Sequence, residues 1–225
     1  MFMKSKFWIV EMPKYSIILF CLLNIVAMFL YPGGSIHNKE QVGYVFTKNF
    51  FSDLGTTISY SGSENMVSCI LFNISLCICG FTFIMLFYTV RSLFKFKSLS
   101  FFATLFGVLG GVCFIGVAFT PANLLLDLHI LFAHGIFRCL LIASILYTIL
   151  IFKTEGFDNK YAYGFVSLGV AVFIYVMISE VGPDPRSHPG ALVLQVVSQK
   201  AIALWILLSI YLYSIGLGKY IYKKI

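Results

Sequence analysis

The sequence predicts an all-α fold, a polytopic membrane bundle of six transmembrane helices formed as a single domain over residues 1–225. Three observations support this fold class. Apolar residues make up 60% of the chain and charged residues only 11%, whereas soluble domains average about 25% charged residues. The apolar residues gather in six runs of roughly the 20 residues that cross a bilayer as a helix. Basic residues are concentrated in alternate loops.

Turn-forming residues separate the apolar runs. The first run is closed by Tyr31–Gly34 (YPGG) and the third by Thr120-Pro121, and proline and glycine both interrupt helices. The first run could instead be the core of a secretory signal peptide. It is longer than such cores and no A-x-A-like site follows it, so we expect an uncleaved span. The six expected spans are residues 15–30, 66–90, 98–119, 123–152, 161–179 and 191–217.

The basic residues predict an orientation. One side of the bundle carries both termini and the links after the second and fourth spans. This side holds eleven basic residues: Lys4, Lys6, Lys14, Arg91, Lys95, Lys97, Lys153, Lys160, Lys219, Lys223 and Lys224. The other side holds Lys39, Lys48 and Arg186, with Lys200 just inside the sixth span. Because basic loops stay in the cytoplasm, we expect cytoplasmic termini and longer loops, 31–65 and 180–190, outside. The expected location is the plasma (inner) membrane of a prokaryote.

Several functional classes lack their signatures. All six cysteines lie within apolar runs, without a C-x-x-C pair or a histidine at ligand spacing, which is typical of buried thiols. The sequence contains no phosphate loop, nucleophile elbow, H-E-x-x-H motif or haem signature. The net charge of +7 does not form a basic, aromatic-rich surface for nucleic acid. We therefore predict no cofactor and no nucleic-acid partner. The expected partners are membrane lipid and other membrane proteins.

Four polar residues interrupt the fourth span. At 100° per residue, Asp127, His134 and Arg138 lie within about 40° of one another on one helical face, while His129 points away from it. Because ionisable groups in a membrane are costly, we expect the shared face to look into the bundle. The stripe is an acid–base or ion site, a structural polar network, or a set of interfacial residues in contact with lipid headgroups. The i,i+5 spacing of the histidines suits zinc poorly, so metal binding by His129, His134 and Asp127 is the less favoured form.

The outer loops carry further candidates. Residues 49–65 are rich in hydroxyl groups and glycine yet have an apolar side, which favours a segment lying in the membrane interface. There Ser52-Asp53 could cap a short helix, or Asp53 could pair with His134 or Arg138. The proline-rich loop 180–190 holds His188 and is either part of the site or a solvated loop. In the third span, Gly107-x-x-x-Gly111 predicts close packing of two helices.

Taken in order, these motifs resemble an uncharacterised six-span membrane family, domain-of-unknown-function family 998. The resembling residues are Asn49-x-x-Ser52-Asp53-Leu54-Gly55, Asn73 and Gly80, a glycine-rich third span ending in Phe-Thr-Pro, Asp127 opening a histidine-bearing span, and Gln199-Lys200 with Trp205. A looser likeness links the outer loop to the DRAM/Frag/Sfk group of six-span proteins. The resemblance implies a six-helix bundle and no established reaction. Lys200 stands where the family often has arginine, which puts in doubt any role that needs a bidentate guanidinium.

Three functions remain open on the sequence. The leading interpretation is a lipid- or partner-associated bundle with a polar pocket at its outer face, and the balance of features favours a protein that is not an enzyme. The second is an enzyme that acts on lipid headgroups in the outer leaflet, with catalytic groups drawn from Asp53, Asp127, His129, His134, Arg138 and His188. The third is a small-solute or proton-coupled transporter, although no inverted repeat or broken helix pair supports it.

Overall fold

The computed structural model describes residues 6–223, and in this part of the chain the only regular elements are helices. Six of them are long and apolar enough to cross a membrane, which confirms the predicted number of long apolar helices. The long helices are α2 (Met12–Leu30), α3 (Met66–Val90), α4 (Lys97–Ala118), α5 (Leu126–Phe152), α6 (Lys160–Val181) and α7 (Pro189–Tyr222); the short ones are η1 (Phe7–Glu11), η2 (Phe51–Gly55) and η3 (Arg91–Leu93). Lys4 and Lys224 of the predicted basic side lie outside the described residues.

The helix ends differ most from the expected spans in the first and last helices. The first begins at Phe7, because the π-helical turn η1 runs directly into α2. The last is 34 residues long and extends past residues 191–217 at both ends. A helix is held by backbone hydrogen bonds, so it can continue past the polar residues at which an apolar run ends. At 1.5 Å per residue, α7 is about 50 Å long, more than a hydrocarbon core of roughly 30 Å requires.

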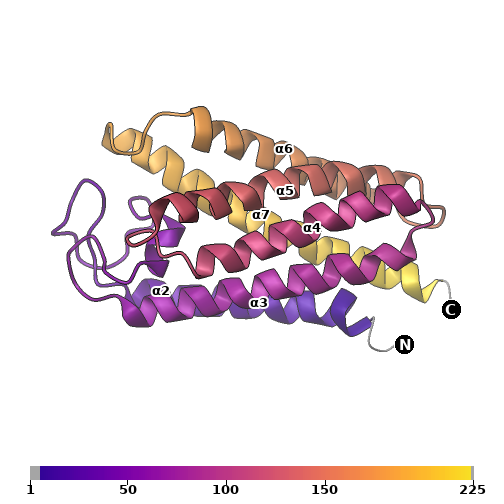
Figure 1. Cartoon of the computed structure of the whole chain (residues 1–225), viewed down its shortest axis with the longest axis horizontal. Coiled ribbons are helices and arrows are strands. Elements are labelled where there is room, and N and C mark those ends of the chain that lie inside the picture. Colours follow the sequence, from indigo (N-terminus) through magenta and orange to yellow (C-terminus); the bar gives the residue numbers. More distant parts are fainter. Residues whose placement is uncertain (1–5, 224–225) are drawn as a thin grey trace.

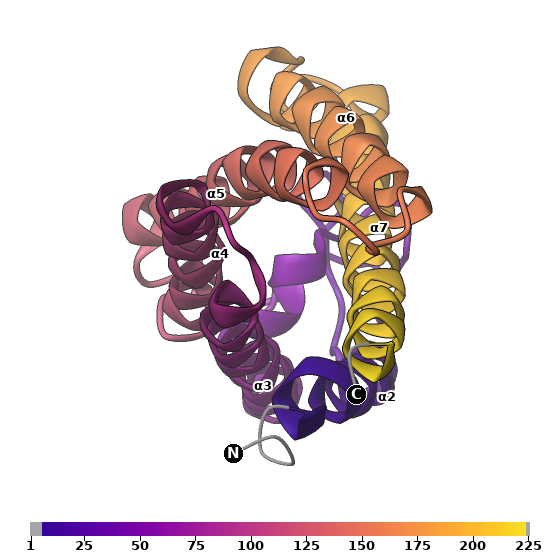
Figure 2. The same ribbon diagram turned by 90° about the vertical axis from the view of Figure 1, so that its right-hand side faces the viewer.

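The six helices form a ring in chain order. Each long helix packs against the helices before and after it in the sequence, and the ring closes where α7 returns to α2. Figure 2 shows this ring along its axis. Contact between α2 and α7 is the sparsest in the ring, so this seam is its loosest point.

The two ends of the ring differ in character (Figure 1). The end we call the termini end carries both chain termini and the two links 91–96 and 153–159. The opposite end, called the loop end below, carries the segments 31–65, 119–125 and 182–188. The polar residues that the sequence singles out are therefore gathered toward one end of the bundle.

Aromatic side chains fill the ring near the termini end. Tyr147 and Tyr213 are almost fully buried, with ring centroids 5.7 Å apart. The ring of Phe87 lies 5.3 Å from that of Tyr147, and the ring of Phe165 lies 4.7 Å from that of Tyr213. Large aromatic side chains bury much apolar area each, so this half of the bundle has a continuous core.

Helices α3 and α4 approach each other through glycine, as the Gly107-x-x-x-Gly111 motif predicts. A Cβ atom added at Gly111 would lie 2.7 Å from the carbonyl oxygen of Gly80, and one at Gly80 would lie 2.6 Å from the carbonyl oxygen of Gly111. A Cβ at Gly107 would meet the ring of Phe87 at 2.4 Å. The two backbones are thus closer than any side chain at these positions permits.

Candidate functional site

The loop end of the ring is filled by the chain segment 49–56, which we call the inserted segment. It contains the short helix η2, seen inside the ring in Figure 2 in purple. Asn49 and Leu54 have no exposed surface, and Asp53 is 5% exposed. The sequence predicts that residues 49–65 lie in the membrane interface; residues 53–56 are instead buried inside the ring, whereas residues 60–64 are exposed. The hydroxyl and amide groups of the segment bond within the protein, which allows it to be buried inside the ring.

Asn49 connects the inserted segment to the rest of the loop. Its Nδ2 donates to the carbonyl oxygen of Gly34 at 2.7 Å and to Oδ2 of Asp53 at 3.3 Å. Its Oδ1 accepts from Nε2 of Gln41 at 2.8 Å and from the amide of Val45 at 3.0 Å. One buried amide therefore satisfies four polar groups, as buried polar groups require.

Asp53 caps the short helix, which is one of the two roles that the sequence left open. Its Oδ2 accepts from the amide of Phe50 at 2.8 Å. Burial raises the pKa of Asp53 to about 7, while the hydrogen bonds from Asn49 and Phe50 and the charge of Lys200 act in the opposite direction. The alternative, in which Asp53 pairs with His134 or Arg138, is wrong, because both side chains contact Glu180 instead.

Helix α7 holds the inserted segment through two consecutive residues. Oε1 of Gln199 accepts from the amide of Phe51 at 2.7 Å. Nζ of Lys200 donates to the carbonyl oxygen of Asn49 at 2.5 Å and to that of Val196 at 3.4 Å. Lys200 is only 7% exposed, so its charge lies inside the protein.

Helix α3 holds the segment from the other side. Nδ2 of Asn65, just before α3, donates to the carbonyl oxygens of Thr56 at 2.8 Å and Leu54 at 3.2 Å. The hydroxyl of Ser68 donates to the same Leu54 carbonyl at 3.1 Å. A Cβ at Gly55 would lie 2.6 Å from the ring of Phe72, so only glycine fits there without movement. The S-D-L-G motif is thus a packing and capping motif here.

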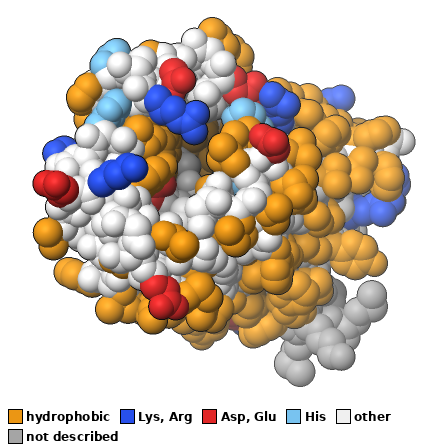
Figure 3. Space-filling model, turned by 60° about the vertical axis from the view of Figure 1, so that its left-hand side comes forward, with side chains coloured by type: hydrophobic (Ala, Val, Ile, Leu, Met, Phe, Trp, Pro, Cys, Tyr) orange, Lys and Arg blue, Asp and Glu red, His pale blue; other side chains and the backbone are white. Residues whose placement is uncertain are grey.

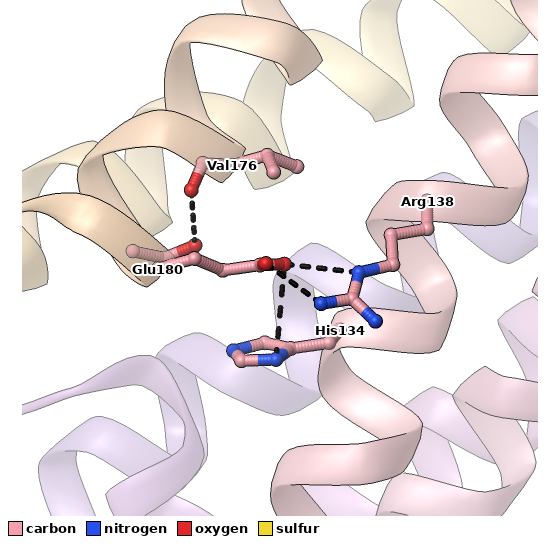
Figure 4. A network of polar contacts seen from close by, with 5 residues as sticks. His134, Arg138, Val176 and Glu180 are labelled. Carbon is pink, nitrogen blue, oxygen red and sulfur yellow. Dashed lines mark hydrogen bonds and ion pairs between the residues drawn. The ribbon is translucent and has the colours of Figure 1, made fainter.

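The fourth-span stripe has a different arrangement from the one predicted. Arg138 forms a two-pronged pair with Glu180 of α6, with Nε 3.1 Å from Oε1 and Nη2 2.7 Å from Oε2. Nδ1 of His134 lies 3.8 Å from Oε1 of the same carboxylate. Figure 4 shows this group between the two helices. The Arg138 side chain is 58% exposed, so the stripe lies at the outer α5–α6 seam and does not face the bundle interior.

Asp127, expected to face the interior, lies on the surface, whereas His129 is buried. Asp127 is exposed and has no hydrogen bond or ion pair within residues 6–223. His129 is 7% exposed, and its Nδ1 lies 2.7 Å from the carbonyl oxygen of Thr120. The expectation that the face of Asp127 looks inward and that His129 points away from the interior is wrong, because helical angles fix which residues share a face but not which face turns inward.

The loop after α6 is tied down by short-range contacts. His188 caps α7, with Nδ1 accepting from the amide of Ala191 at 3.1 Å. Nε2 of Gln195 donates to the carbonyl oxygen of Ile178 at 2.6 Å, which joins α7 to the end of α6. Nε2 of His37 lies 2.9 Å from the carbonyl oxygen of Pro185, joining the two long loops. Charged and histidine side chains gather around a hollow at this end (Figure 3), while hydrophobic side chains cover the flank.

A groove of about 410 Å³ lies along the loose α2–α7 seam. It includes Phe20, Asn24, Ile25, Phe46, Lys200 and Leu204 in its lining. Ile25 is 50% and Leu204 56% exposed, while Phe20 and Lys200 are buried. The groove therefore runs from the flank of the bundle inward to the inserted segment. A smaller cavity of about 70 Å³ lies behind it and shares the side chains of Phe20, Phe51 and Ala203.

The sequence candidates are thus distributed over separate places. Asp53 lies in the inserted segment, His134 and Arg138 at the α5–α6 seam, and His188 at the start of α7. In the described part of the chain, no three His, Cys, Asp or Glu side chains lie close enough to hold a metal ion. The sequence analysis missed the role of Asn65 and gave Lys200 no place in the site. A charged residue inside an apolar helix was the available signal.

Comparisons with known proteins add no relative: no family model matches the chain, and neither curated proteins nor solved structures give a match. The resemblance to domain-of-unknown-function family 998 stays a prediction, carried only by its motifs.

We predict that the folded state is stabilised by acid through Asp53. The unfolded chain has an ordinary aspartate pKa near 3.8, whereas the folded protein raises this pKa to about 7. Between these values the folded state holds a proton that the unfolded state lacks. The contribution of Asp53 is therefore complete below about pH 4 and lost as pH rises through about 7, by at most about 4 kcal/mol.

This prediction is checked by thermal unfolding of the protein in detergent at about pH 5 and about pH 8. Asp53→Asn keeps an oxygen to accept from Phe50 and should remove the loss of stability between about pH 5 and about pH 8. The matched control is Asp127→Asn, because Asp127 is exposed and its side chain has no partner among the described residues. This substitution should leave the pH dependence of the wild-type protein unchanged. A loss of stability from about pH 5 to about pH 8 that survives Asp53→Asn would contradict the prediction.

For the α5–α6 seam we predict a coupled pair. Arg138→Leu leaves the Glu180 carboxylate without its bidentate partner and should lower the unfolding midpoint by a small amount, because water screens a pair that is largely exposed. Adding Glu180→Leu should recover most of the loss, because replacing both partners removes the unpaired charge. The measurement is a double-mutant cycle on unfolding midpoints. Additive losses from the two substitutions would show that the pair is not coupled.

Proposed function

We propose that the protein is an integral membrane protein that takes the chain of a membrane lipid into the α2–α7 groove, with the polar end of the lipid at the inserted segment. The orientation expected from the basic residues accompanies this proposal, with cytoplasmic termini and the loop end outside. The carrying observation is the groove itself, which is apolar, opens on the flank of the bundle and ends at buried polar groups.

The position of the groove favours lipid over a water-soluble ligand. Six helices are long and apolar enough to cross a membrane, and in the proposed membrane protein the flank of the bundle would face hydrocarbon. Exposed Ile25 and Leu204 lie on the way into the groove, and a molecule entering past them must itself be apolar. A volume of about 410 Å³ falls at the small end of the roughly 300–1,000 Å³ range of ligand sites. This size suits one hydrocarbon chain.

The enzyme alternative has less support. It requires at least three of the Asp and His candidates to meet in one pocket. The structure gives Asp53, His134 and His188 different partners on different elements. Of the candidates for a polar transport path, Asn24, Asn73 and Arg138, the last lies at the outer α5–α6 seam with a 58% exposed side chain. We therefore base the proposal on the groove.

The proposal is tested by photo-crosslinking. The protein is reconstituted in phosphatidylcholine vesicles with a monoacylglycerol that carries a diazirine in its acyl chain, and the crosslinked peptides are mapped. We expect crosslinks in α2 and α7 around the groove. Ala203→Phe, which adds a ring to the groove wall, should reduce them several-fold.

Leu208→Phe is the matched control, because Leu208 is 48% exposed on the same helix and adds the same ring to the open flank. It should leave the crosslinks unchanged. Crosslinks spread evenly over all six helices, insensitive to Ala203→Phe, would contradict lipid binding in the groove.

A further inference from the structure

The inner end of the groove holds a buried lysine side chain that forms no ion pair with any described residue. Lys200 lines the groove and is 7% exposed. Its ammonium bonds to two backbone carbonyls and lies 4.9 Å from the ring centroid of Phe46 and 5.4 Å from that of Tyr44. Within residues 6–223 it forms no ion pair. Buried charges are normally paired, because desolvation of a lone ion is costly. An anion is therefore the group that this end of the groove lacks.

A second polar atom at the groove also lacks a partner. Asn24 lines the groove and is 2% exposed. Its Nδ2 donates to the carbonyl oxygen of Phe20 at 2.7 Å and to the hydroxyl of Ser75 at 2.8 Å, which fixes the orientation of the amide. Its Oδ1 is buried and has no hydrogen-bond partner. An unsatisfied buried acceptor costs roughly 1–3 kcal/mol, and a ligand that brings a donor would remove this cost.

We propose that the ligand is a single-chain phospholipid with a free glycerol hydroxyl, a lysophospholipid, whose phosphate pairs with Lys200 and whose hydroxyl donates to Oδ1 of Asn24. This inference rests on the proposed function and specifies its ligand. The groove has room suited to one chain, Lys200 supplies the charge for the phosphate, and Asn24 supplies the acceptor for the hydroxyl. A diacyl phospholipid has no free hydroxyl on the glycerol that carries its acyl chains, and a monoacylglycerol has no anion.

The charge near the site agrees with an anionic headgroup. Asp53 is the nearby acid that attracts Lys200, but its carboxylate is directed to Asn49 and Phe50. Burial raises the pKa of Asp53 to about 7, so at and below neutral pH a large share of this acid is uncharged. The remaining neighbours of the ammonium are carbonyl oxygens and aromatic rings, which carry no negative charge.

The test uses competition against the diazirine monoacylglycerol crosslink in the full-length protein. Three unlabelled competitors share one acyl chain: a lysophosphatidic acid, its 2-deoxy analogue without the hydroxyl, and a monoacylglycerol without the phosphate. We expect the lysophosphatidic acid to compete about tenfold better than either of the other two, since a charged hydrogen bond or a rescued buried acceptor has an effect of this size. Equal competition by all three in the wild-type protein would overturn the inference, whether or not any variant folds.

Variants assign each preference to a residue. Lys200→Gln should abolish the preference for the phosphate and leave competition by the monoacylglycerol unchanged, whereas Lys200→Arg should retain the preference. Asn24→Ala should abolish the preference for the hydroxyl only. If the phosphate preference survives Lys200→Gln, the assignment of Lys200 is wrong. If crosslinks do not localise to α2 and α7, the proposed function itself is wrong. If they localise there but show no headgroup preference, only the assignment of the ligand is wrong.

Discussion

Asn49→Ala is expected to lower the free energy of unfolding by about 3 kcal/mol. The substitution removes four hydrogen bonds at a side chain with no exposed surface. It leaves the carbonyl of Gly34 and the amide of Val45 without this partner, and a buried polar group left unsatisfied costs roughly 1–3 kcal/mol. The loss of stability would be larger if no water reached these polar groups. The loop lies at the end of the bundle, however, where water can enter and form some of the lost hydrogen bonds.

The measurement is the midpoint of thermal unfolding in detergent, where a loss of this size should shift the midpoint by roughly 6–12 °C in a chain of this length. Asn38→Ala is the matched control. It removes the same side chain from the same loop, but Asn38 is exposed and its side chain accepts a single hydrogen bond, from the amide of Glu40. Equal effects of the two substitutions would show that the inserted segment is not held by Asn49.

Gly111→Ala is expected to lower the free energy of unfolding by about 2–3 kcal/mol, in the usual range for overpacking a tight interior. The added methyl would lie 2.7 Å from the carbonyl oxygen of Gly80 and 3.1 Å from the amide nitrogen of Ile84. Both are backbone atoms, which no side-chain rotation moves aside. Helices α3 and α4 would have to separate, and the packing around Phe87 and Gly107 would loosen with them.

Gly110→Ala provides a control one residue away. The nearest atoms to a methyl at Gly110 are side-chain atoms of Leu140 at 3.5 Å and Cys139 at 3.6 Å, which is ordinary contact. Because alanine favours the helix over glycine by up to about 1 kcal/mol, Gly110→Ala should be neutral or slightly stabilising. Two variants of the same chemistry with opposite signs would locate the close approach at Gly111. A destabilisation by Gly110→Ala as large as that by Gly111→Ala would contradict this location.

Composition and periodicity determined the class of fold. A chain with 60% apolar residues has six runs that form long helices, because a helix satisfies every backbone group within one segment. The sequence also predicted the close packing at Gly107-x-x-x-Gly111, since the spacing of small residues is a property of the helix itself. The cap at Asp53 was predicted as one of two alternatives for the same local reason: its partner, the amide of Phe50, is three residues away.

The tertiary structure alone decided which polar residues meet. Helical spacing placed Asp127, His134 and Arg138 on one face, but it could not say whether that face turns inward, and the partner of Arg138 proved to be Glu180, 42 residues further along the chain. The burial of Asn49 and its bond to Lys200, at a separation of 151 residues, depend in the same way on how the ring closes. Contacts across the ring depend on the relative rotation of whole helices, which no local pattern encodes. The α2–α7 groove is the clearest case, because it exists only where the first and last helices of the chain come together.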